Sequence, residues 1–130
     1  MKNIKKIILI VFAIMICVTS YGFAKQIGEF TEFKITYRGE RTGFLLKEGP
    51  NGSPFILNLY PSRDLRPMAV KYWMENVNGR KRSDTHRLEC GYRNENSNWA
   101  SQGYSYALKM ARENWWDKEA YITGSWSPDK

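Results

Sequence analysis

The sequence predicts an all-β fold, a small antiparallel β-sandwich or barrel of about seven strands, preceded by a helical signal peptide. Three observations lead to this fold class. Apolar and polar residues alternate in several short segments with the period of two that is typical of strands with one wet face. Turn signals separate these segments about every dozen residues. Tyrosine and tryptophan are plentiful and, together with threonine, isoleucine and valine, they favour a pleated, half-buried surface over a helix.

The first 24 residues have the three-part layout of a secretory signal peptide. Residues 1–6 hold three lysines and no acid, and an unbroken apolar run of 12 residues follows at 7–18. Gly22 and Ala24 occupy the small-residue positions that a signal peptidase reads, so we expect cleavage after Ala24 and a single domain at 25–130. A membrane-spanning helix needs about 20 apolar residues, so we expect no transmembrane segment in the mature chain. The sequence therefore predicts secretion to the cell envelope or the extracellular medium.

Export also changes the charge and the cysteine content. The whole chain carries a formal charge of +7, and without the three signal-peptide lysines 17 basic residues face 13 acidic ones, a net charge of +4. This mildly basic balance favours an anionic cell-wall polymer or lipid surface as the partner, whereas nucleic acid is not expected outside the cell. Cys90 becomes the only cysteine, which excludes an internal disulfide. We expect its thiol either to be buried, as free cysteines usually are, or to form an intermolecular bridge.

The first half of the mature chain contains three predicted strands. Apolar and polar residues alternate over 33–38, which predicts a strand with one wet face. A second short strand is expected at 42–47. Residues 49–54 are dense in glycine, proline and asparagine and form the clearest break in the chain. The third strand is expected at 55–60, where the first, third and fifth residues are apolar and share a face.

The middle of the chain predicts a β-hairpin. Alternation over 68–77 runs into Asn78 and Gly79, the strongest short hairpin signal that a sequence offers. The return strand is expected at 83–92. Residues 93–98 are polar and predict a loop.

The last part of the chain contains one ambiguous segment, at 103–116. Its first half alternates and is rich in tyrosine and serine, whereas its second half holds good helix formers at helical spacing. Its place among strands favours a strand, and a helix is the alternative. A final strand is expected at 120–126, where small and aromatic residues alternate. Residues 127–130 are expected to form a frayed tail.

The chain lacks the residue types that most catalytic and metal sites need. His86 is its single histidine, and it would lie about 13 Å from Cys90 on a regular strand, too far for a Cys–His pair. One histidine and one cysteine are too few for a zinc site, and no loop carries the closely spaced acids that calcium prefers. Two of the scattered acids could converge as a hydrolytic pair, but no spacing singles out a pair. We therefore expect no catalytic residue, no cofactor and no metal.

Two short stretches are candidate binding residues. Arg80, Lys81 and Arg82 concentrate positive charge at the expected hairpin tip, where they would contact a phosphate-rich wall polymer or an anionic lipid. A solvated turn without a ligand is the alternative. Trp115 and Trp116 are adjacent, so in a strand or extended turn they would point in opposite directions. One is expected in the core and the other in water, facing a partner or a membrane interface, unless both are covered.

Three short motifs carry a resemblance to a known family. They are Tyr72-Trp73 before Asn78-Gly79, the stretch AREN at 111–114, and the closing stretch YITGSW at 121–126. On these motifs the chain resembles small exported proteins of Gram-positive, Bacillus-type bacteria with an uncharacterised domain. The resemblance covers about residues 30–126 and implies a signal peptide and a β-rich secreted domain, with no known activity and no catalytic residues. In overall style, as an exported, basic protein with aromatic strands, the chain is also similar to lactococcin-type bacteriocins.

Together these observations predict a secreted, non-enzymatic β-rich protein that binds an envelope or extracellular ligand. The alternative is a bacteriocin-like antibacterial toxin that acts on neighbouring cells.

Overall fold

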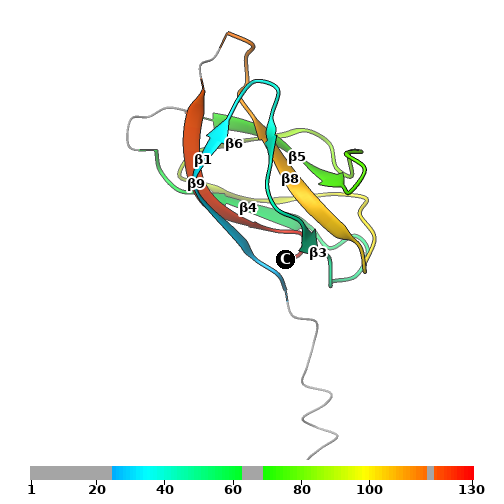
Figure 1. Cartoon of the computed structure of the whole chain (residues 1–130). Coiled ribbons are helices and arrows are strands. Elements are labelled where there is room, and N and C mark those ends of the chain that lie inside the picture. The colour runs from blue at the N-terminus through cyan, green and yellow to red at the C-terminus, as the bar shows by residue number, and fades with distance from the viewer. Residues whose placement is uncertain (1–24, 63–68, 117–118) are drawn as a thin grey trace, which may run out of the picture.

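The computed structural model describes residues 25–62, 69–116 and 119–130, which form nine strands and no helix. The strands make two antiparallel sheets in a sandwich-like arrangement (Figure 1), so the all-β fold class is confirmed. The signal peptide and its cleavage after Ala24 fall outside the described residues and stay predictions. No helix in the described part of the chain is long and apolar enough to cross a membrane.

The first sheet has four strands in the order β1-β9-β4-β7. Their bounds are β1 Gly28–Ile35, β9 Ala120–Ser127, β4 Phe55–Leu59 and β7 Arg93–Asn96. The central strand β9 pairs with β1 on one side and with β4 on the other, where Leu57 faces Trp126. The register of β1 shifts between Phe30 and Phe33, which is the mark of a β-bulge.

The second sheet follows the order β2-β8-β5-β6, and β3 also pairs with β8. The bounds are β2 Glu40–Arg41, β3 Leu45–Leu46, β5 Ala69–Asn76, β6 His86–Glu89 and β8 Ser105–Ala111. β5 and β8 form the centre of this sheet, with Trp73 opposite Lys109 and Met74 opposite Leu108. Since successive residues point to opposite faces, Met74 and Leu108 face the core while Trp73 and Lys109 face outward.

The hydrophobic core lies between the two sheets and is filled by alternate residues of their long strands. Its largest fully buried side chains are those of Trp126, Tyr72, Phe55, Ile35, Leu57, Leu59, Met74, Leu108, Met110 and Val70. Phe55 of the first sheet and Tyr72 of the second meet edge to face, with ring centroids 6.1 Å apart. The sandwich is thus held together by aromatic and aliphatic side chains, without a disulfide in the described residues.

The two sheets are joined differently along their two sides. β6 passes directly into β7 through residues 90–92, and Leu59 of β4 makes two backbone hydrogen bonds with this corner. On the other side the chain passes from β1 to β2 through residues 36–39, where the amide of Arg112 donates to the backbone oxygen of Thr36 at 2.8 Å. Near β3 the amide of Leu46 also donates to the Oε1 atom of Gln26 at 2.8 Å. The chain therefore connects the two sheets along both sides, and a side-chain hydrogen bond adds a link beside β3.

Several strand boundaries differ from the sequence prediction. The expected strand at 42–47 contains only the short strand β3, and β2 at 40–41 precedes it. With β2 and β7, which the sequence does not predict, the described residues contain nine strands and not the expected seven or so. The ambiguous segment at 103–116 contains strand β8, because Tyr106, Leu108 and Met110 all fill the core between two neighbouring strands. Tertiary packing thus outweighs the helix propensity of this segment.

The polar stretch at 93–98 is not the predicted loop, since it contains the edge strand β7. Asn94 and Asn96 point inward, where the Tyr72 hydroxyl donates to Oδ1 of Asn96 at 2.7 Å and Nδ2 of Asn94 donates to the same oxygen at 2.9 Å. Nδ2 of Asn96 also donates to the backbone oxygen of Phe55 at 3.3 Å. Hydrogen bonds replace apolar contacts here, so the inner face accepts amide side chains.

The predicted frayed tail at 127–130 is also wrong, because a buried ion pair holds it. Nζ of Lys47 lies 2.7 Å from Oδ1 of Asp129, and both side chains are fully excluded from solvent. Lys47 donates to two backbone oxygens as well, and the second oxygen of Asp129 accepts from the amides of residues 48 and 49. Every charge in the pair is therefore compensated by several partners.

The hairpin at Asn78 and Gly79 forms as predicted and ends strand β5. Gly79 has a positive φ of 78°, and its amide donates to the backbone oxygen of Asn76 at 3.0 Å. Oδ1 of Asn76 accepts from the amides of residues 78 and 80, which fixes the turn. On the return, Lys81 forms a bridge with Glu75. This register places Lys81 beside the outward-facing residues of β5.

Candidate anion-binding face

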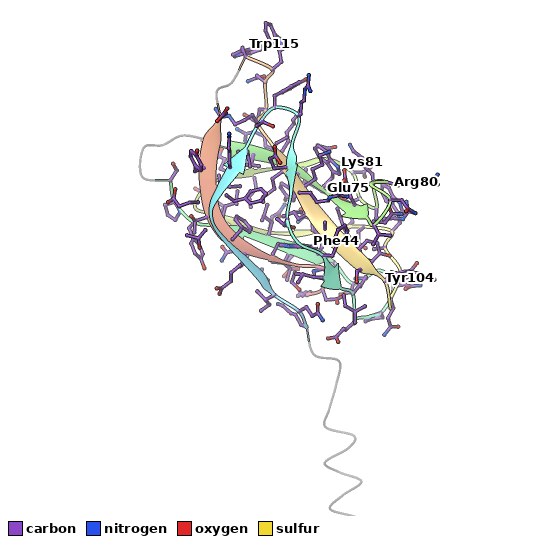
Figure 2. All side chains as sticks on the ribbon, viewed as in Figure 1. Phe44, Glu75, Arg80, Lys81, Tyr104 and Trp115 are labelled. Carbon is purple, nitrogen blue, oxygen red and sulfur yellow. The ribbon has the colours of Figure 1, made fainter. Side chains whose placement is uncertain are left out.

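The three basic residues of the hairpin have different surroundings. Arg80 and Lys81 are exposed, whereas Arg82 is half-buried, its amide bonded to the backbone of Met74. Figure 2 shows Arg80 at the margin of the molecule and Lys81 close to Glu75. Lys81 does not simply project into solvent, because its Nζ atom lies 4.5 Å from the ring centre of Trp73. The prediction of a solvent-facing side chain is therefore correct for Arg80, but for Lys81 it omits the contact with Trp73.

Trp73 is the centre of the outer face of the second sheet. Lys81 approaches its ring from the hairpin, and Lys109 approaches it from the neighbouring strand β8, with Nζ 5.9 Å from the ring centre. Both distances fall within the range of cation–π attraction. The alternating pattern of β5 predicts that Trp73 points outward, but the pairing with Lys109 depends on the register of β5 against β8.

A nearly buried carboxylate, that of Glu75, orients this cluster. Nε1 of Trp73 donates to Oε2 of Glu75 at 2.7 Å, and the Glu75 side chain is only 7% exposed. Lys109 and Arg41 each have a nitrogen 3.9 Å from one of its oxygens. Ala107 lies opposite Glu75 on β8, and its small side chain leaves room for the carboxylate. Glu75 thus fixes the indole ring and draws two cations toward it.

Two further cation–aromatic contacts border the cluster. The guanidinium of Arg41 lies 5.2 Å from the ring centre of Phe44, and Nζ of Lys71 lies 5.1 Å from that of Tyr37. We call the whole group the cationic face. It consists of Arg41, Lys71, Trp73, Glu75, Lys81 and Lys109. Its four cations outnumber its single acid, so the face suits an anionic ligand.

Sequence reasoning found only Lys81 of this group. The clustered charges at the hairpin are visible as neighbours in the chain, whereas Arg41, Trp73 and Lys109 come together only through the pairing of three strands. One feature of the sequence could have indicated this site. Trp73 and Glu75 alternate with core residues in one strand, so both are expected on its outer face.

The structure corrects the prediction for Trp115 and Trp116. They are 73% and 65% exposed, so neither enters the core, and their rings meet edge to face with centroids 5.7 Å apart. The prediction of opposite directions assumed extended backbone, whereas these residues lie in a turn. Figure 2 shows Trp115 far from Lys81 and Arg80, so the two candidate binding stretches do not form one site.

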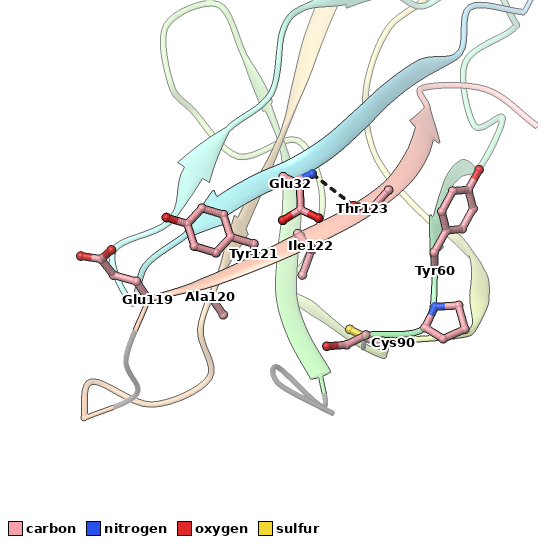
Figure 3. Close-up of a pocket in the computed structure, with 10 residues that line it drawn as sticks. Glu32, Tyr60, Cys90, Glu119, Ala120, Tyr121, Ile122 and Thr123 are labelled. Atoms are coloured by element: carbon pink, nitrogen blue, oxygen red, sulfur yellow. Dashed lines mark hydrogen bonds between the residues drawn. The ribbon is translucent and has the colours of Figure 1, made fainter. Parts of the chain in front are cut away.

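A concave region lies between the first residues of β9 and the stretch after β4 (Figure 3), with a volume of about 670 Å³. It is lined by Glu32 and Glu119, by Cys90 and by two tyrosines. Glu32 sits in the bulge of β1 with a positive φ of 49°, and its amide donates to Oγ1 of Thr123 at 3.1 Å. Glu119 is paired with Lys34 at 2.9 Å. Sequence spacing gives no hint of Glu32, because a β-bulge has no clear signature there.

His86 and Cys90 do not share one environment. The His86 ring packs against Phe55 and Tyr72, with centroids 5.9 and 5.7 Å away, whereas Cys90 lines the hollow of Figure 3. Among the described residues no group of three or more histidine, cysteine or acidic side chains is placed to hold a metal ion.

The thiol of Cys90 is expected to react slowly. Burial raises the pKa of this half-buried thiol, and the nearby charge of Arg112 opposes that effect only in part. Less thiolate is therefore present at pH 7.5 than in an unfolded chain, and thiolate is the reactive form. Alkylation by iodoacetamide, followed by mass spectrometry, should be slower in the native protein than in urea. Equal rates in the two states would contradict this expectation.

Comparisons with known proteins give no further guide to the site. No protein-family model matches the chain, and no curated protein or solved structure matches it significantly. The resemblance to small exported Bacillus-type proteins therefore stays a prediction.

Proposed function

We propose that this protein is a secreted, non-enzymatic binding protein whose cationic face holds an anionic ligand of the cell envelope or the extracellular medium. One observation carries the proposal. The indole of Trp73 is approached by the ammonium groups of Lys81 and Lys109 and is fixed by the nearly buried carboxylate of Glu75.

The cluster keeps positive charge available for a ligand. Glu75 balances one of the four cations, which leaves an excess of three positive charges over a small area of the sheet. Cation–π contacts orient an ammonium group without neutralising it, so its N–H donors can still meet phosphate or carboxylate oxygens. Since these side chains are already positioned, binding costs less conformational entropy than it would with freely moving lysines.

The exposure of these cations indicates that binding depends on salt. The side chains of Arg41 and Lys109 are 41% and 30% exposed, so dissolved ions reach them. At physiological ionic strength, interactions between exposed charges are screened beyond about 8 Å. Retention of the protein on an anionic surface should therefore fall as salt is added.

The test measures retention of the full secreted protein on phosphate-bearing polymer beads. Replacing both Lys81 and Lys109 by glutamine is expected to weaken retention about tenfold, a change of about 1.4 kcal/mol in binding free energy. The reason is the loss of both ammonium groups beside Trp73. The salt dependence of retention should become shallower in the same variant.

The matched control removes two lysines elsewhere. Lys25→Gln with Lys34→Gln lowers the net charge by the same amount, and both residues are exposed and belong to the β1 side of the first sheet. This control should bind nearly as well as the unmodified protein. Equal weakening by both double variants would show that only net charge matters and would overturn the proposal.

The antibacterial alternative remains a prediction with its own test. Purified protein applied to lawns of related strains would produce clearing if the protein is a toxin, whereas a binding protein leaves the lawn intact. Clearing that persists in the Lys81→Gln, Lys109→Gln variant would assign that activity to another part of the molecule.

A further inference from the structure

An apolar cleft lies between the two sheets on the side of β1. It runs between β1 and the segment that joins β2 to β3, and it has a volume of about 290 Å³. Buried Phe30 and Trp126 line its inner part, half-buried Phe33 and Leu45 line its walls, and Phe44 at the rim is 43% exposed. An engineered cavity of about 150 Å³ in another protein holds benzene, so this cleft has room for a longer apolar group.

The cleft is open because of its position in the fold. β1 is an edge strand of the first sheet, and residues 42–44 interrupt the edge of the second sheet between β2 and β3. Gly43 in this interruption has open space where a side chain would begin, with no atom within 4 Å of an added Cβ. The hydrogen bond from Leu46 to Gln26 bridges the two sheets next to the cleft.

Arg41 connects the cleft to the cationic face. Its guanidinium lies 5.2 Å from the ring centre of Phe44 at the rim of the cleft, and it lies 3.9 Å from the carboxylate of Glu75. Arg41 also pairs with Lys109 across β2 and β8. Figure 2 shows Phe44 on the same side of the molecule as Glu75 and Lys81. An apolar cleft and a cationic surface therefore share one border.

We infer that the ligand is an anionic amphiphile with an acyl chain, whose chain enters the cleft while its head group meets Arg41 and Lys109. The apolar lining excludes a purely polar polymer from the cleft, and the cations at the border favour a negative head group. Glu29, an exposed acid, also lines the cleft and disfavours an anion at its own position. The head group is thus directed toward Arg41.

This inference rests on the proposed function only for the head group. The acyl chain is recognised by the cleft, which is a separate structure with separate residues. Chain recognition and charge recognition can therefore be tested independently of each other.

The experiment titrates the full secreted protein with straight-chain alkyl carboxylates of six to twelve carbons by calorimetry, below their micelle-forming concentrations. Each buried methylene contributes about 0.8 kcal/mol, so affinity should rise about fourfold per added carbon until the cleft is full. Alkyl glucosides of equal chain length, which are neutral, should bind more weakly. Affinity that does not change with chain length would overturn the inference.

Two variants locate the chain and the head group. Gly43→Phe is expected to fill the cleft and to weaken binding at least tenfold, while Ser97→Phe adds the same ring at an exposed residue just after β7, at the opposite edge of the first sheet. Arg41→Gln should weaken the binding of the alkyl carboxylates and leave the binding of the alkyl glucosides unchanged. Unchanged carboxylate binding by Gly43→Phe would overturn the inference.

A measurement on the unmodified protein covers the case in which Gly43→Phe fails to fold. A nitroxide label near the end of a ten-carbon chain should broaden the NMR signal of the Trp126 indole N–H, because Trp126 lines the cleft. Broadening confined to Trp115 and Trp116 would place the chain elsewhere and refute the inference.

The two proposals fail in distinguishable ways. In one outcome, affinity rises with chain length but polymer retention is unaffected by Lys81→Gln and Lys109→Gln. That result would refute the proposed function and support the cleft as the binding site of the chain. In the other outcome, polymer retention depends on salt but the affinity for carboxylates does not depend on chain length. That result would support the proposed function and refute the cleft as a binding site.

Discussion

Replacing Asp129 by asparagine is expected to destabilise the protein by about 3–5 kcal/mol, the usual cost of removing one partner from a buried ion pair. The ammonium group of Lys47 would stay buried without its counter-charge. An amide nitrogen in place of one carboxylate oxygen would also face N–H donors from Lys47 or from the backbone of Glu48 and Gly49. Urea unfolding followed by tryptophan fluorescence measures the change in unfolding free energy.

A double-mutant cycle separates this pair from general packing. Lys47→Met alone and Asp129→Leu alone should each be destabilising, while the double variant should lose less than the sum of the two, because it leaves no buried charge unpaired. Additive effects would show that the two charges do not depend on each other. Glu119→Gln serves as a control, since it breaks an exposed ion pair with Lys34 and should leave the unfolding midpoint nearly unchanged.

The same pair sets a response to acid. Burial alone would raise the pKa of Asp129, but hydrogen bonds from Lys47 and from the amides of Gly49 and Glu48 outweigh it and hold the pKa below the ordinary value of 3.8. The ionised pair therefore contributes its full stability above that ordinary value. The contribution is lost as the pH falls through the lowered pKa of the folded state. Asp129→Asn should show a flatter loss of stability below pH 4 than the unmodified protein.

Replacing Gly124 by alanine is expected to cost at least about 3 kcal/mol and to lower the yield of folded protein. An added Cβ would lie 2.1 Å from the backbone oxygen of Asn58 and 3.1 Å from Cζ of Phe30. Since β9 is paired on both sides, Gly124 cannot move away from β4 without pressing on β1. Thermal unfolding monitored by circular dichroism measures the effect.

Gly43→Ala is the matched control for this substitution. It adds the same methyl group at a position where no atom lies within 4 Å, so the unfolding free energy should change by no more than about 0.5 kcal/mol. Equal destabilisation by the two variants would mean that the effect of Gly124 arises from the unfolded chain and not from the close approach of two strands.

The sequence predicts those strands whose inward residues are apolar. In β4 the residues Phe55, Leu57 and Leu59 alternate with their neighbours, and all three are buried. β7 was missed, because Asn94 and Asn96 satisfy their polar groups by hydrogen bonds that a hydropathy pattern does not contain. The buried tail was missed for a similar reason, because the sequence does not show that Asp129 forms an ion pair with the distant residue Lys47.

In the candidate site too, the sequence predicts what depends on neighbours in the chain and misses what depends on strand pairing. Lys81 was found because it stands beside two other basic residues at a turn that the sequence specifies. Trp73 and Lys109 were missed as partners, because only the register of β5 against β8 places them opposite each other. Only one of Trp115 and Trp116 was expected in water, because the prediction used a rule that holds for strands. Both are exposed and pack against each other in a turn, which that rule does not describe.

The hydrogen bonds between Tyr72 and the asparagines of β7 have a consequence for the pairing of that strand. β7 has no apolar residue of its own, so hydrophobic contacts cannot select its alignment against β4. A slip by one residue would turn Asn94 and Asn96 to solvent and bring Arg93 and Glu95 into the core, facing the Tyr72 hydroxyl. Two amides and one phenol thus select a single register for an edge strand and disfavour the alternative pairings through which edge strands join to other chains.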